Sequence, residues 1–116
     1  IGGWQNCLHA RNVILPVPLF RDRIPVIVDR VTTLCGPGEL IDVIITERGI
    51  AINPRRQDLL DSVKGKGLPL VTIEELKETA EKICGIPEKA QFDERVVAAI
   101  KWVDGTVLDA VHKIKK

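Results

Sequence analysis

The sequence is poor in several kinds of residue, and each shortage excludes a class of protein. Its 116 residues include two Trp, two Phe and no Tyr, and 17 basic residues nearly balance 16 acidic ones. A nucleic-acid-binding protein would concentrate positive charge and supply aromatic rings for stacking, so we expect no nucleic-acid partner. The apolar runs are too short to cross a bilayer and no signal peptide is visible, so we expect no membrane association.

Cysteine and methionine are also informative by their scarcity. Cys7, Cys35 and Cys84 are odd in number and widely spaced, which fits neither a disulfide framework nor a metal site. We interpret them as reduced, mostly buried thiols and predict a cytoplasmic protein that binds no metal. Methionine is absent even from position 1, and Ile1-Gly2-Gly3 is typical of a glycine turn entered from an earlier strand. We therefore expect the natural N-terminus to lie upstream.

The residues that are present indicate a folded α/β domain. Hydrophobic residues make up 45% of the chain and charged residues 28%, the balance of a globular protein. Short β-branched segments predict strands at residues 13–15, 24–28 and 41–46. The last segment is apolar almost throughout, which predicts burial on both faces in a parallel or mixed sheet. After a turn at 47–49, residues 50–52 continue extended.

Two helices and a hairpin follow. Asn53-Pro54 predicts the start of one helix, which ends at Gly65 and Gly67. Thr72 and Glu75 predict a capping box at the start of a second helix, which ends at Gly85. From about residue 94 the chain predicts a hairpin, with Asp104-Gly105 as a two-residue turn. Residues 106–114 would also suit a helix, and this alternative stays open.

Some residues could carry chemistry. The backbone of Gly2-Gly3, in the run GGWQN at 2–6, could approach a ligand closely and donate N–H groups to a developing oxyanion; the alternative is an ordinary turn. Cys7 and His9 would share a face if residues 7–12 were extended, which permits a Cys–His dyad, although a buried thiol and a surface imidazole explain them as well. Glu47 follows the most buried strand, where ligands of α/β sheets collect. It could be a nucleophile or base, or simply pair with Arg48 or with solvent.

Arg55 and Arg56 stand in the first turn of a predicted helix, where the helix dipole disfavours cations. This placement indicates a possible anion-binding role for both. Pairing with Asp58 or a nearby strand is an equally good interpretation. Lys64, Lys66 and the lysines at 113, 115 and 116 are interpreted as solvated surface charge.

The sequence also resembles a known family. Residues 29–39 (DRVTTLCGPGE) and 41–54 (IDVIITERGIAINP) resemble the α subunits of bacterial citrate lyase, as do the segments 2–6, 72–76 and 102–106 (GGWQN, TIEEL, WVDGT). The glycine pair and the strand at 44–46 are similar to the second half of family I CoA-transferases. The resemblance implies a mixed-sheet, CoA-transferase-like α/β half-domain of the NagB/RpiA/CoA-transferase-like group. It divides the chain into residues 1–93, which belong to this domain, and 94–116, a C-terminal hairpin extension.

The resemblance implies a reaction and partners. Citrate lyase α subunits exchange acetate for citrate on the thioester of an acyl carrier protein, the γ subunit, and the β subunit then cleaves the citryl group to oxaloacetate. We accordingly expect an oligomeric complex with β and γ subunits. We expect no cofactor bound directly, but a CoA-derived prosthetic group on the carrier protein, with acetyl-CoA or another acyl-CoA as a possible ligand.

The resemblance also suggests which parts of the site these residues supply. The family's nucleophilic glutamate precedes the glycine pair and commonly stands beside Asn-Gly, but all eight glutamates here follow the pair and no Glu-Asn-Gly occurs. We therefore expect no catalytic nucleophile in this chain, and a substrate-binding role for Gly2, Gly3, Trp4 and Asn6. The alternatives are a CoA-transferase or acyl-CoA hydrolase for another short-chain acid, or a non-catalytic docking module of the complex.

Overall fold

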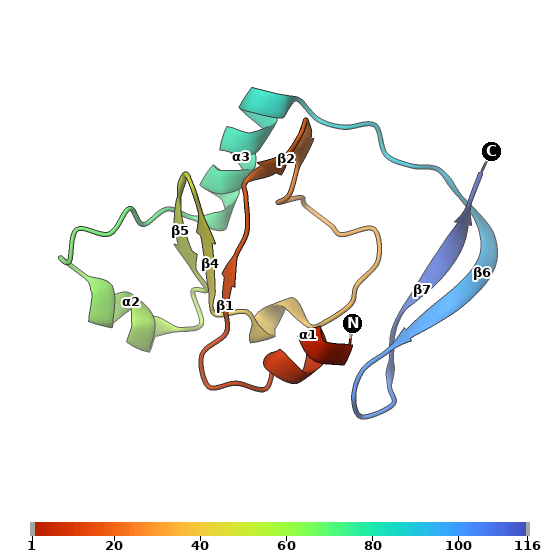
Figure 1. Ribbon diagram of the computed structural model, residues 1–116, viewed down its shortest axis with the longest axis horizontal. Coiled ribbons are helices and arrows are strands. Elements are labelled where there is room, and N and C mark those ends of the chain that lie inside the picture. Colours follow the sequence, from red (N-terminus) through yellow and green to blue (C-terminus); the bar gives the residue numbers. More distant parts are fainter. Residues whose placement is uncertain (1, 116) are drawn as a thin grey trace.

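The computed structural model describes residues 2–115, and Figure 1 labels their helices and strands. In chain order the elements are α1 (Gly2–Cys7), β1 (Ile14–Pro16), β2 (Phe20–Arg21), β3 (Ile24–Pro25), the 3-10 helix η1 (Gly38–Leu40), β4 (Val43–Thr46), β5 (Gly49–Ile52), α2 (Gln57–Val63), α3 (Ile73–Cys84), β6 (Phe92–Lys101) and β7 (Val107–Ile114).

A small mixed sheet forms the centre of the body, as the sequence predicts. Its strand order is β1-β4-β5; β1 runs parallel to β4, and β5 returns antiparallel to β4 after a tight turn. Val43 and Ile45 point to one face of β4, and Ile44 and Thr46 point to the other. Of these four residues only Val43 is buried; Ile44 and Thr46 are half-buried, and Ile45 is 37% exposed. The prediction that this strand is buried on both faces is therefore wrong for the part of the chain described.

The predicted strand at 24–28 is much shorter than expected. β3 contains only Ile24 and Pro25, paired antiparallel with Arg21 and Phe20 of β2. Proline has no N–H to donate to a ladder, so the strand stops where Pro25 stands. The segment still makes one further bond, from the Val26 N–H to the Leu19 carbonyl at 3.0 Å.

Helix α3 packs over β5 and β3 and closes the hydrophobic core. Leu76 and Ala80 of α3 meet Leu19 and Ala51, all of them buried. The predicted capping box is confirmed: the Thr72 hydroxyl accepts the Glu75 N–H at 3.1 Å, and the Glu75 carboxylate accepts the Thr72 N–H at 2.7 Å.

Helix α2 begins later than the sequence predicts. Its first residue is Gln57, so Asn53-Pro54 does not open it and Arg55 and Arg56 precede it. Asn53 is used elsewhere, because its amide donates to the Ile41 carbonyl at 3.0 Å and its Oδ1 accepts the Arg55 N–H at 3.1 Å. The end of α2 agrees with the prediction, since the chain turns away at two glycines with positive φ, Gly65 and Gly67.

The C-terminal segment is a long antiparallel hairpin, β6–β7, so the alternative of a helix at 106–114 is wrong. Its loop has three residues rather than the predicted two. The Gly105 N–H donates to the Trp102 carbonyl and the Trp102 N–H donates to the Thr106 carbonyl, and Gly105 adopts φ +88°. A left-handed residue after a tight turn is the usual closure of a three-residue hairpin and explains the glycine.

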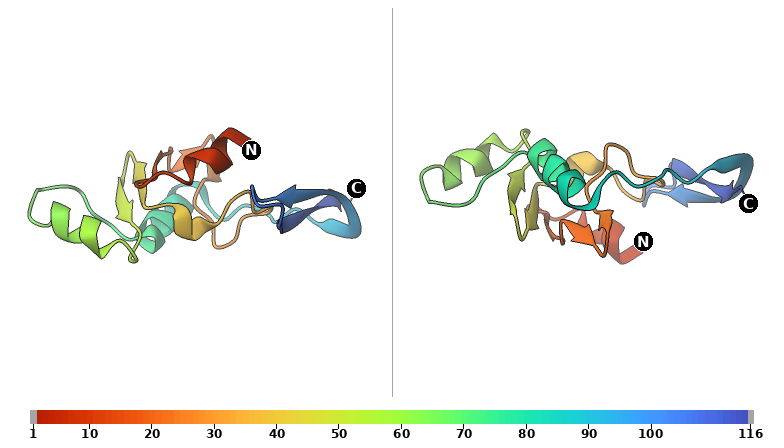
Figure 2. Two further views of the ribbon diagram at one scale, coloured as in Figure 1. Left: turned by 90° about the horizontal axis from the view of Figure 1, so that it is seen from below. Right: turned by 90° about the horizontal axis from the view of Figure 1, so that it is seen from above.

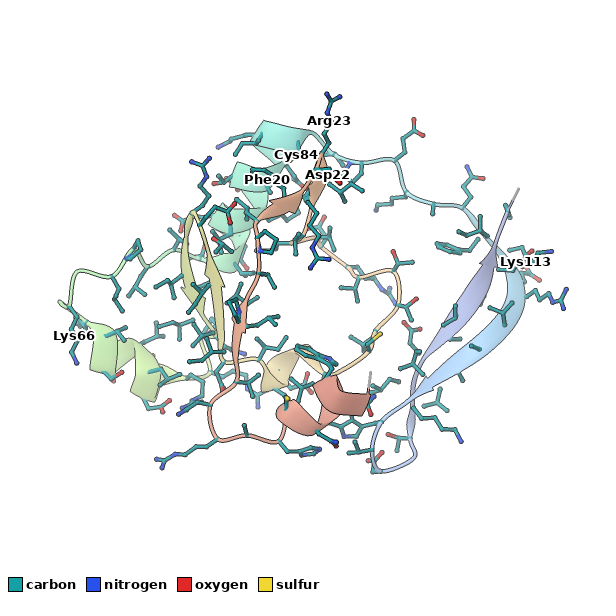
Figure 3. The ribbon with its side chains drawn as sticks, viewed as in Figure 1. Phe20, Asp22, Arg23, Lys66, Cys84 and Lys113 are labelled. Atoms are coloured by element: carbon teal, nitrogen blue, oxygen red, sulfur yellow. The ribbon has the colours of Figure 1, made fainter. Side chains whose placement is uncertain are left out.

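The described chain is flat and elongated. Its extents are 51 × 37 × 19 Å and its radius of gyration is 16.2 Å, against about 13 Å for a compact domain of this length. The hairpin extends away from the body, and α1 and α3 lie toward opposite faces (Figures 1 and 2). Lys66 and Lys113 lie near the two ends of the long axis (Figure 3), and both are exposed, as predicted for surface charge.

Candidate functional site

Helix α1 carries the glycine pair, and it has a packed side and an exposed side. Gly2 and Gly3 lie in this helix, so the prediction that they form a turn is wrong. Gln5 and Leu8 are buried, at 5% and 3% exposed, and form the packed side. Residues four apart in a helix share a face, and Gly2, Gly3, Asn6 and Cys7 are all exposed. Two predicted substrate-binding glycines and Asn6 are therefore brought together on one accessible surface.

Trp4 belongs to the packed side rather than the exposed one. A Cβ atom placed on Gly36 would lie 2.9 Å from Trp4 Nε1 and 2.7 Å from Leu8 Cδ1. Gly36 therefore lets the loop before η1 press directly onto α1. The Trp4 ring, which the sequence suggests for substrate contact, is engaged by this loop of its own chain. By contrast, a Cβ on Gly2 or Gly3 would meet no atom within 4 Å, so the described residues leave that surface open.

The hairpin turn holds α1 from a third direction. The Gln5 amide nitrogen donates to the Lys101 carbonyl at 2.7 Å and to the Cys35 carbonyl at 3.3 Å. The His9 and Trp102 rings are 5.5 Å apart between centroids, and Figure 1 shows the hairpin turn beside α1. The sequence gives one signal for Gln5 that we missed: it stands between two apolar residues, Trp4 and Leu8, at helical spacing.

Cys7 and His9 do not form the arrangement that a dyad requires. Cys7 ends α1 and His9 lies in the following turn, so the two do not share the face of a strand. The His9 ring lies against Trp102 instead. Cys7 is exposed and Cys35 and Cys84 are half-buried, which shows that the prediction of mostly buried thiols is wrong.

Glu47 stands where the carboxyl ends of the parallel strands β1 and β4 meet, as predicted. Its carboxylate accepts the Leu19 N–H at 3.0 Å and 3.3 Å, and Leu19 is the most deeply buried core leucine, at 0% exposed. The carboxylate thus fixes the loop that delivers this core residue, and it does not pair with Arg48. Beside it is an open hollow of about 390 Å³ lined by Pro16, Val17, Pro18, Ile45, Thr46 and Glu47.

Arg56 is held by carboxylates of its own chain. It lies 2.9 Å from the Asp42 carboxylate and 2.7 Å from that of Asp58, and it also donates to the Arg11 carbonyl at 3.2 Å. These bonds hold the pKa of Asp58 down at about 2 and raise that of Arg56. The interpretation of Arg56 as paired is therefore confirmed. Arg55 is exposed, and its anion-binding role stays a prediction.

Asp42 is the buried end of this network, and the sequence analysis missed it. It is 8% exposed, and its carboxylate accepts the Val13 N–H at 2.7 Å. Burial alone would raise the pKa of Asp42, but the bonds from Val13 and Arg56 outweigh burial and hold this pKa below its usual value. The signal was a single charge at the start of an otherwise apolar strand, which demands a partner.

Between residues 2 and 115, no helix combines the length and the apolar character needed to cross a bilayer. In the same part of the chain, His, Cys, Asp and Glu side chains do not gather in any group of three or more that could hold a metal ion.

Comparison with known proteins places this arrangement in a family. The family model described as "Citrate lyase, alpha subunit" matches residues 1–114. The chain belongs to the citrate lyase alpha subunit family. Relatives named citrate lyase alpha chain share 46% identity over 98% of this chain in Klebsiella pneumoniae, and 42% over 99% in Escherichia coli K12. The family prediction from the sequence is therefore confirmed.

A solved structure extends the likeness to three dimensions. A crystal structure described as the alpha subunit of citrate lyase from Streptococcus mutans, in complex with citrate, matches 99% of this chain with a TM-score of 0.94 and 42% identity. The chain spans about a fifth of the length of these relatives, 22% in each of the three. The flat shape with its separate hairpin is thus also found within a much longer citrate lyase alpha chain.

Proposed function

We propose that these residues are part of a citrate CoA-transferase, the α subunit of citrate lyase, which exchanges acetate for citrate on the thioester of an acyl carrier protein. The observation that carries the proposal is the family match over residues 1–114 together with the TM-score of 0.94 to a citrate lyase alpha subunit in complex with citrate. In the exchange, acetyl-thioester and citrate give citryl-thioester and acetate. Neither the alternative acid substrates nor the docking-module alternative gains support from these comparisons.

The partners and the thioester carrier follow from the same proposal. The subunit works with a β subunit, which cleaves the citryl group, and with a γ subunit whose CoA-derived prosthetic group supplies the thiol. An acyl-CoA can replace the carrier thioester because both present the same thiol arm. We also place the protein in the cytoplasm as part of an oligomeric complex.

The exposed side of α1 is the part of the site that this chain contributes. Gly2, Gly3 and Asn6 share it, and the lack of side chains on the glycines lets a reacting carbonyl approach the backbone closely. Covalent catalysis splits the exchange into two easier steps, and we assign the nucleophilic glutamate to a part of the subunit outside these residues. None of the hydrogen bonds or ion pairs of residues 2–8 in the structure involves a glutamate.

The test is acyl transfer by the full-length α subunit. Acetyl-carrier protein is mixed with citrate, acetate or succinate, and the products are separated by mass. We expect citryl-carrier protein from citrate, and at least a tenfold lower rate from Gly3→Val, because about 1 Å of displacement at a reacting centre costs up to roughly 100-fold. Gly38→Val is the matched control, since a Cβ there also meets nothing within 4 Å.

Two results would contradict the proposal. One is preference for succinate over citrate. The other is a Gly3→Val subunit that transfers normally, which would remove the glycine pair from the site. The separate chain of residues 1–116 should form no citryl-thioester, because it lacks the assigned nucleophile.

A further inference from the structure

Gln5 combines burial with two bonds to distant segments. The residue as a whole is buried, with only 5% of its surface exposed. Its amide nitrogen reaches the Lys101 carbonyl at the end of β6, 96 residues away, and the Cys35 carbonyl in the loop before η1, 30 residues away. One side-chain nitrogen thus joins α1, this loop and the hairpin.

These two hydrogen bonds fix the orientation of α1, because its other contacts with the rest of the chain are mostly non-directional. A helix of six residues has no stability of its own, so tertiary contacts set its place. The contacts of Trp4 and Leu8 with Gly36 and of His9 with Trp102 are non-directional, and they permit small displacements along the surface. The Gln5 amide has two N–H groups at a fixed angle. Hydrogen bonds to two backbone carbonyls at once therefore fix both the rotation of the helix about its axis and its position along that axis.

We propose that Gln5 is a positioning residue that sets where the exposed side of α1, with Gly2, Gly3 and Asn6, stands relative to the rest of the site. The proposal rests on the function assigned above. Gln5 lies on the packed side and its amide binds the Cys35 and Lys101 carbonyls, so it acts through the backbone of the residues beside it. A helix displaced by about 1 Å would still bind substrate but would align it poorly, which lowers kcat more than it changes KM.

The experiment compares Gln5→Leu and Gln5→Asn in the full-length α subunit. Leucine fills similar space without a donor, and asparagine keeps the amide but is shorter by one carbon–carbon bond, about 1.5 Å. Asp109→Asn is the matched control. Asp109 accepts the Leu34 N–H at 2.8 Å and so also ties the hairpin to the body, and its other carboxylate oxygen accepts the Ala110 N–H rather than a donor of α1.

We expect Gln5→Leu to lower kcat about tenfold or more, with KM for citrate within about threefold, and Gln5→Asn to lie between it and the wild type. Asp109→Asn should keep kcat within about twofold. Melting temperatures of all variants are measured together. The proposal is overturned if Gln5→Leu keeps wild-type kcat, or if Asp109→Asn loses as much kcat at an equal melting temperature.

A second readout separates this proposal from the proposed function. Amide hydrogen exchange of residues 2–8 should accelerate in Gln5→Leu and Gln5→Asn but not in Asp109→Asn, because Gln5 bonds α1 to distant segments whereas the Asp109 carboxylate bonds Leu34 and Ala110. If the wild-type subunit does not transfer acyl groups to citrate, the proposed function fails, and exchange alone decides whether Gln5 positions the helix. Unchanged exchange in both Gln5 variants would refute it.

Discussion

The Asp42–Arg56 pair offers a sharp test of how the sheet edge is held. Asp42→Asn keeps the shape of the side chain but removes the charge that faces the Arg56 guanidinium at 2.9 Å. The Asp42 side chain is 12% exposed, whereas that of Asp58, the other partner of Arg56, is 64% exposed. A hydrogen bond to a charged, buried group contributes about 2 kcal/mol, whereas exposed ion pairs contribute little. We therefore expect Asp42→Asn to be clearly destabilising and Asp58→Asn nearly neutral.

The assay is hydrogen exchange of the Val13 amide in the full-length α subunit, because this N–H donates to Asp42 at 2.7 Å. A loss of about 2 kcal/mol corresponds to exchange roughly 30 times faster. Peptides from α3 serve as an internal control, since the side-chain hydrogen bonds and ion pairs of α3 in the described residues go to partners outside this network. The reasoning is refuted if Asp42→Asn leaves Val13 protected, or if Asp58→Asn accelerates its exchange equally.

The remaining predictions concern packing, capping and pH. Gly36→Ala should destabilise the subunit by about 1–3 kcal/mol through overpacking against Trp4 and Leu8, whereas Gly38→Ala, with open space, should not; equal melting temperatures for the two would contradict this. Thr72→Ala should cost about 1 kcal/mol by removing the α3 cap, as followed by urea unfolding against Thr79→Ala. Because the folded pKa of Asp42 is lowered, its contribution is present above the unfolded value of about 3.9 and is lost as pH falls through the folded value. Protection of Val13 should fall below about pH 4 in the wild type, whereas an equally steep fall in Asp42→Asn would exclude Asp42 as the cause.

Local signals in the sequence predicted the local structure well. The capping box at Thr72 and the glycines after α2 are set by residues within a few positions of one another, so they need no knowledge of the fold. The hairpin was recognised for the same reason, although its loop was one residue longer than Asp104-Gly105 suggested. Here the tertiary structure only confirms what neighbouring residues dictate.

Predictions failed where a side chain bonds to or packs against a residue far away in the sequence. Asn53 is a good helix cap by type, but its amide is bound to Ile41, twelve residues earlier, so α2 starts without it. Gly2-Gly3 is typical of a turn, yet contacts of Trp4 and Leu8 with Gly36 and the bonds of Gln5 hold the segment as a helix. Arg56 was interpreted correctly only through one of its alternatives, because its second partner, Asp42, lies in a distant segment, directly before β4.

The exposed surface of the chain and the open side of its site both require residues that pack against them. The described residues expose 8572 Å², about 2,300 Å² more than the roughly 6,300 Å² of a compact protein of 12.9 kDa. The excess includes Ile14 on the outer strand of the sheet and Val96, Val97 and Val107 on the hairpin, each more than half exposed. Exposed apolar residues of this kind require other residues to cover them, and a two-stranded hairpin has only marginal stability by itself. The same backbone shape occurs within a chain of which it forms 22%. The rest of the α subunit, to which we assign the nucleophilic glutamate, can bring this carboxylate to the open side of α1 when it packs against these residues, so the contacts that stabilise the fold would also complete the site.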